Sequence, residues 1–165
     1  MTLRKLVSSC VFGLVGLATS AVADELPRSV WQTEIYADPM HKGGVIAAAE
    51  QISTPVDGVT VKAIVRCWSA TLEGDVRFVL SSGEWLGGDA HWQFDRMRPR
   101  TDRWRRNPDG DAIVVPEALR ADILRGLLAA KVLTLSLDGG SAFQIPLAGS
   151  SQAIGKAQEQ CRHPH

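Results

Sequence analysis

Hydrophobic and polar residues alternate with a period of two along most of the chain after residue 30, which predicts strands with one face toward a core. The clearest case is VTVKAIVRCW, where Val61, Ala63, Val65 and Cys67 share one face. One segment, GVIAAAEQ, is also compatible with a helix, but the turn residues that follow it favour a strand. The predicted strands are 31–36, 44–51, 59–68, 75–82, 90–95, 112–116, 131–138 and 141–147.

Two further segments carry apolar residues at helical spacing. The first, 117–130, follows Pro116, a residue that suits the first turn of a helix. The second is predicted to be capped by Ser150 or Ser151, and its apolar face includes Cys161. Because most links between strands are short, antiparallel pairing is expected. The predicted fold class is therefore mainly β with two short helices, an antiparallel β-sandwich-like sheet or pair of sheets with a C-terminal helix.

The first 23 residues have the three parts of a secretory signal peptide. Arg4 and Lys5 supply a cationic start, an uncharged apolar run follows, and the AVA that ends at Ala23 is a cleavage site. The apolar run is too short and wrongly flanked for a membrane span. We therefore expect export to the periplasm with cleavage after Ala23, a short linker at 24–30, a single domain at 31–165, and no stable membrane insertion.

The two cysteines outside the signal segment, Cys67 and Cys161, are predicted to form a disulfide. Disulfides persist in oxidising compartments, and both residues fall on core faces of their elements. Two buried free thiols are the alternative. Neither cysteine lies in a CxxC motif, which disfavours redox catalysis.

Six arginines lie within FDRMRPRTDRWRR, at 94–106. Without the signal segment the chain has 16 basic and 18 acidic residues, whereas a nucleic-acid binder is expected to be basic. We expect Arg96 and Arg98 to continue the strand inward until Pro99 ends it. After Pro99 we expect a solvated loop that binds the acidic face of a protein partner, although ion pairing and solvation alone are the simpler interpretation. The candidate partner-binding residues are Arg100, Arg103, Trp104, Arg105 and Arg106.

The five tryptophans are expected to divide into two groups. Trp31, Trp68 and Trp92 fit core positions, and Trp85 and Trp104 are candidates for exposure. The sequence contains no catalytic or nucleotide-binding motif. It also indicates no metal or cofactor site, because the two histidines of the RHPH tail are too few for structural zinc.

Short anchors along the chain resemble the small secreted proteins of the VasI type, which are associated with type VI secretion clusters. The anchors are Trp31, DPM at 38–40, Cys67, QFD at 93–95, Trp104, FQIPLAG at 143–149, Ala153-Ile154 and Cys161. Position 93 is Gln where that pattern has a basic residue. The resemblance implies a periplasmic accessory or binding protein without catalysis. It does not identify a partner.

The sequence therefore leaves three alternative hypotheses for the function. The first is a non-catalytic periplasmic accessory or binding protein, associated with a type VI-like secretion system through protein contacts. The second is an inhibitor or immunity-type protein that blocks an envelope-directed enzyme with a projecting loop at 96–106. The third is a hydrolase whose two carboxyl groups are brought together across a cleft by the fold.

Overall fold

The computed structural model describes residues 30–83, 85 and 87–164. The predicted signal peptide and nearly all of the predicted linker lie outside these residues. The described part contains nine strands and two helices: β1 (Gln32–Ala37), β2 (Val45–Ile52), β3 (Val61–Trp68), β4 (Gly74–Leu80), β5 (Gly87–Phe94), β6 (Arg100–Arg106), β7 (Ile113–Val114), α1 (Glu117–Ala129), β8 (Val132–Leu137), β9 (Phe143–Pro146) and α2 (Ser150–Arg162).

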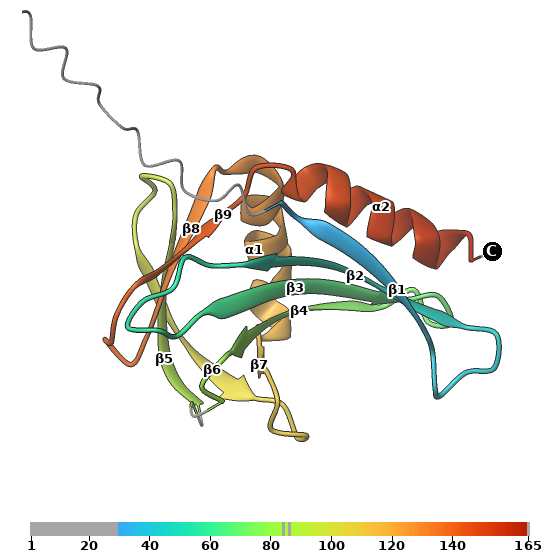
Figure 1. Cartoon of the computed structure of the whole chain (residues 1–165), viewed down its shortest axis with the longest axis horizontal. Coiled ribbons are helices and arrows are strands. Elements are labelled where there is room, and N and C mark those ends of the chain that lie inside the picture. Colours follow the sequence, from blue (N-terminus) through green and yellow to red (C-terminus); the bar gives the residue numbers. More distant parts are fainter. Residues whose placement is uncertain (1–29, 84, 86, 165) are drawn as a thin grey trace, which may run out of the picture.

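The strands form one antiparallel sheet in the order β1-β2-β3-β4-β7-β6-β5-β8-β9. The sheet bends over itself, so that β1–β4 run across β5, β8 and β9 (Figure 1). The hydrogen bonds that join the halves include Thr54 N–H to the Gln144 carbonyl at 3.1 Å and Trp31 Nε1–H to the Pro146 carbonyl at 3.0 Å. This mainly β, sandwich-like sheet with a C-terminal helix confirms the predicted fold class.

The core lies between the two halves of the sheet and beneath the helices. Helix α2 packs against β1, β2 and β3, and α1 contacts β4 and α2. The Phe78 and Trp104 rings stack with their centroids 5.5 Å apart at the centre. Burying such large apolar side chains is the main source of stability in a domain of this size. Other fully buried residues include Leu133, Leu135, Ile145 and Ile154.

The predicted disulfide is confirmed. Cys67 near the end of β3 and Cys161 in the last turn of α2 are bonded, with their Cα atoms 6.2 Å apart. The bond fastens the C-terminal helix to the sheet. Among the described residues, no helix is long and apolar enough to span a bilayer.

Two expectations about local structure are wrong. The segment after Pro99 is strand β6 and not a loop. The N-cap of α2 is Gly149, at φ 85°, and neither predicted serine caps the helix. The Ser150 hydroxyl instead donates a 2.5 Å hydrogen bond to the Leu127 carbonyl, which joins the start of α2 to the end of α1. A serine whose hydroxyl is used by another element cannot cap its own helix.

Candidate partner-binding site

The arginine-rich stretch forms the turn between β5 and β6 together with the whole of β6. Asp95 begins the turn at φ 48°, a left-handed conformation that Asp tolerates better than most residues. Its carboxylate accepts the backbone N–H of Lys131 and of Val132, each at 2.9 Å. These bonds fix the turn against the link between α1 and β8. The chain leaves the sheet here, so Arg96 and Arg98 are exposed, and their expected inward orientation is wrong.

Strand β6 divides its residues between the two faces of the sheet. Trp104 points inward and is 0% exposed, so its expected exposure is wrong and its side chain cannot reach a partner. Arg103 and Arg105 point to the opposite face and are exposed. They have no hydrogen bond or ion pair within the part of the chain that the structure describes. Because successive side chains of a strand alternate, a cluster in the sequence does not become one patch.

The remaining two predicted residues make structural contacts. The Arg100 guanidinium lies over the Trp92 ring, 4.7 Å from its centroid, and donates to Asp122 of α1 at 3.1 Å. Asp102 accepts a 2.9 Å hydrogen bond from Trp92 Nε1. Arg106 donates to the Gly83 carbonyl. Both arginines therefore hold neighbouring elements together.

A groove of about 370 Å³ opens between the β5–β6 turn and α1. We call it the arginine groove. It is lined by Trp92, Phe94, Met97 and three arginines, Arg98, Arg100 and Arg125, together with the carboxylates of Asp95 and Asp122. Asp122 is bonded to Arg100 and, at 3.2 Å, to Arg125, while Arg98 has no acidic partner among the described residues. The groove thus combines an apolar floor with excess positive charge.

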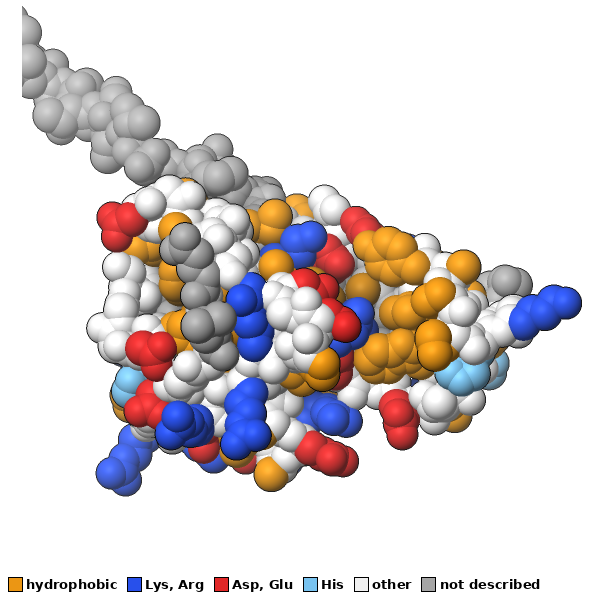
Figure 2. Space-filling model, turned by 90° about the horizontal axis from the view of Figure 1, so that it is seen from below, with side chains coloured by type: hydrophobic (Ala, Val, Ile, Leu, Met, Phe, Trp, Pro, Cys, Tyr) orange, Lys and Arg blue, Asp and Glu red, His pale blue; other side chains and the backbone are white. Residues whose placement is uncertain are grey.

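The side of the molecule away from α2 differs from the arginine groove in its surface residues. Hydrophobic side chains gather in one area there, and Lys and Arg side chains lie beside it (Figure 2). A shallow depression on the outer face of the sheet is lined by Tyr36, Ile46, Ala48, Ile64 and Val79, among others. Arg103 and Arg105 lie on this outer face, separate from the arginine groove.

Sequence reasoning found Arg100 but missed the residues that complete its surroundings. Arg98 is expected from the sequence to continue the strand inward, but it is exposed in the turn, as is Met97, by 66%. Arg125 comes from α1, and no local pattern connects it with the arginine stretch. Among the other tryptophans, Trp31 and Trp92 are buried as expected, whereas Trp68 and Trp85 are half-buried. No cluster of three or more metal-ligating side chains occurs among the described residues.

No protein-family model matches the chain, and no curated protein matches it in sequence. One solved structure with a similar outline is invasion associated protein B from Bartonella henselae, at a TM-score of 0.48 and 14% sequence identity. The alignment covers 78% of this chain and 96% of that one. A similarity of this size transfers no function to the chain.

Proposed function

We propose that the chain is an exported, non-catalytic binding protein that acts through protein contacts, with the arginine groove as its docking site for an acidic segment of an envelope protein. The observation that carries this proposal is the position of Arg98. Its guanidinium borders an apolar groove and has no acidic partner among the described residues. A carboxylate on a partner would supply that missing charge in fork geometry.

The composition of the groove supports the proposal. Interface cores are enriched in Arg, Met and aromatic side chains, and their centres are apolar. Here Trp92 and Phe94 lie in the floor, and the exposed Met97 and Arg98 stand at the rim. An exposed Met is flexible enough to adapt to a partner's surface.

The disulfide supports export, because such bonds persist in oxidising compartments. We propose the periplasm as that compartment on the strength of the signal-like N-terminal segment. An accessory role in a type VI-like secretion system is part of the same proposal and rests on the resemblance alone.

The two alternatives receive less support from the geometry. The inhibitor hypothesis relied on a projecting loop at 96–106, but 100–106 is a strand inside the sheet. The hydrolase hypothesis needs a carboxyl pair free to exchange protons. Glu73 and Asp75 line one pocket, yet the Asp75 carboxylate accepts hydrogen bonds from both Arg66 and Arg77. That arrangement suits ion pairing.

A pull-down from the periplasm with two matched variants tests the proposed site. The first, Arg98→Ser with Arg125→Ser, removes two charges from the arginine groove. The second, Arg103→Ser with Arg105→Ser, removes the same charge from the outer face. We expect the groove variant to lose a protein that the wild type and the outer-face variant both retain, because only the groove carries the contact. Identical captures from all three proteins would contradict the proposal.

A further inference from the structure

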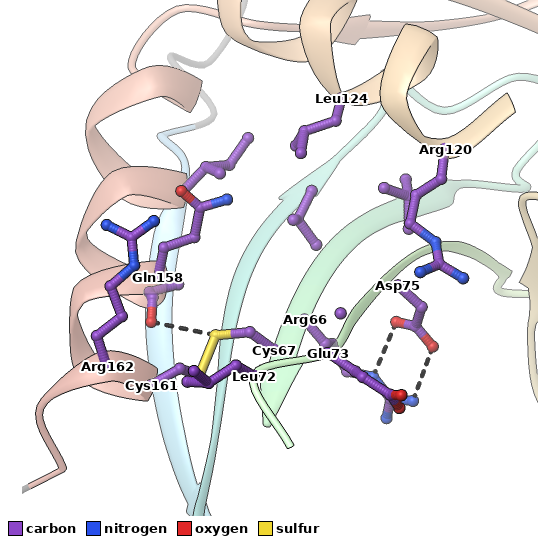
Figure 3. A pocket seen from close by; sticks show the side chains of 15 residues that line it. Arg66, Cys67, Leu72, Glu73, Asp75, Arg120, Leu124, Gln158, Cys161 and Arg162 are labelled. Carbon is purple, nitrogen blue, oxygen red and sulfur yellow. Dashed lines mark hydrogen bonds and ion pairs between the residues drawn. A yellow bond between two sulfur atoms is a disulfide. The ribbon is translucent and has the colours of Figure 1, made fainter. Parts of the chain in front are cut away.

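A second cavity lies between the two helices and is lined on α1 by Arg120 and Leu124, whereas the arginine groove is lined by Asp122, Arg125 and Gly126 of the same helix. The helices are joined where the end of α1 meets the start of α2, through the bond between Ser150 and Leu127. They diverge from that point, and a pocket of about 400 Å³ opens between their other ends (Figure 3). Strands β3 and β4 form its floor, and the disulfide lies at one side. We call it the interhelix pocket.

The floor and one wall of this pocket are apolar. Val65 and Val76 contribute from the strands, Leu124 from α1 and Ile154 from α2. Ligand pockets in proteins are mostly of this kind, with volumes of roughly 300–1,000 Å³ and a few polar groups that set orientation. A water molecule occupies about 30 Å³ of liquid volume, so 400 Å³ corresponds to about 13 atoms of that size.

The polar groups of the pocket are predominantly cationic. Arg66, Arg120 and Arg162 line it, against the carboxylates of Glu73 and Asp75. Asp75 is bonded to Arg66, at 3.2 Å between Nη2 and Oδ2, and also to Arg77 outside the pocket. Burial raises the pKa of the Asp75 carboxyl, and the guanidinium groups of Arg66 and Arg120 act in the opposite direction. The lining therefore carries three arginines against two carboxylates, an excess of one positive charge.

Among the residues that line the pocket, Arg120 has a buried polar atom without a hydrogen-bond partner, although its guanidinium interacts electrostatically with Asp75. Its Nε is buried and has no hydrogen-bond partner among the described residues. A buried polar group without a partner costs free energy, and a charged one costs more. Arg120 also stands in the first turn of α1, which begins at Glu117, where the helix dipole favours an anion. An anionic group beside the Arg120 guanidinium would interact favourably with its positive charge and with the helix dipole.

We propose that the interhelix pocket binds a small amphiphile with an anionic head, which lies at Arg120, and a short aliphatic chain, which lies on Val65 and Leu124. The head is a carboxylate or a phosphate, since a guanidinium binds both in the same fork geometry. A chain of about ten carbons fits the pocket volume. This site is independent of the arginine groove and of the proposed partner.

Isothermal titration calorimetry on the disulfide-intact wild type tests the ligand class. The probes are decanoate, decyl phosphate, decyltrimethylammonium and acetate, each below its critical micelle concentration. We expect saturable one-to-one binding of decanoate or decyl phosphate, and at least tenfold weaker binding of the cationic probe and of acetate. The stronger of the two anionic probes identifies the head group. No saturable binding of either, or equal binding of the cationic probe, overturns the proposal.

Variants test the location. Arg120→Met removes the charge and keeps much of the volume, and Lys156→Gln removes a charge from an exposed position of α2 outside the pocket. We expect Arg120→Met to weaken the preferred anionic probe at least tenfold and Lys156→Gln to change it less than twofold. Leu124→Trp, which fills the pocket, keeps the test valid if Arg120→Met does not fold, and it should abolish binding. Equal effects of the pocket variants and Lys156→Gln would place the ligand elsewhere.

Discussion

Removal of the Cys67–Cys161 bond is the perturbation whose magnitude follows most directly from the structure. The two residues are 94 positions apart, so the bond closes most of the described chain into one loop. In the chain-entropy account, closing a loop of that length in the unfolded state stabilises the fold by about 4–5 kcal/mol. Replacing both cysteines by Ala is the appropriate change, because a buried Ser hydroxyl would add a cost of its own.

The expected loss is large compared with the 5–15 kcal/mol or so that holds a typical domain folded. With a urea m-value of about 2 kcal/mol/M, the midpoint of unfolding should fall by about 2 M. The melting temperature should fall by about 15–20 °C for a domain of this size.

Urea unfolding followed by tryptophan fluorescence measures this loss. The wild type in reductant should resemble the double Ala variant, and the variant itself should not respond to reductant. A loss below about 1 kcal/mol would refute the reasoning, because the loop would then restrict the unfolded chain far less than its length implies.

Three smaller predictions concern single side chains. In Gly126→Ala the added Cβ would lie 2.2 Å from the ring of buried Phe94, and the overpacking, at about 1–3 kcal/mol, should exceed the gain in helix propensity and lower the melting temperature. The hydrogen bond to Glu34, with burial and the Glu50 charge, raises the pKa of Tyr36 to about 12, so phenolate absorbance of this only tyrosine should titrate there, and at lower pH in Glu34→Gln. Trp104→Ala should cost about 3–5 kcal/mol in urea unfolding, whereas a negligible loss would mean that the ring is not in the core.

The spacing of apolar residues, together with turn signals, was sufficient to predict eight of the nine described strands and both helices within a few residues. It failed at β6 for a physical reason. The inward positions of this strand are Arg100, Asp102, Trp104 and Arg106, and only Trp104 reaches the core. The other three have polar partners on neighbouring segments: Arg100 bonds to Asp122, Asp102 to Trp92, and Arg106 to the Gly83 carbonyl. A strand whose inward side chains are mostly charged has no period-two pattern to detect.

The candidate site was harder to predict than the fold. The sequence indicated an arginine-rich region, but the groove requires Arg125 and Asp122 of α1 to meet the β5–β6 turn. That meeting depends on the bonds from Asp95 to Lys131 and Val132, which are contacts between distant segments. Likewise, no local pattern connects Arg120 of α1 with α2 across the interhelix pocket. Such sites depend on which distant segments the topology brings together, and the periodicity of a single sequence does not predict that.

Photocrosslinking from the arginine groove tests the central claim most directly. A benzophenone amino acid replaces Met97 at the rim of the groove or, as the control, Met40 in the β1–β2 loop; these residues are 66% and 82% exposed. The two segments lie at opposite ends of the molecule (Figure 1). In intact cells the account predicts one discrete protein adduct from position 97, lost in Arg98→Glu, and none from position 40. The same adducts from both positions, or an adduct from position 97 that survives Arg98→Glu, would contradict it.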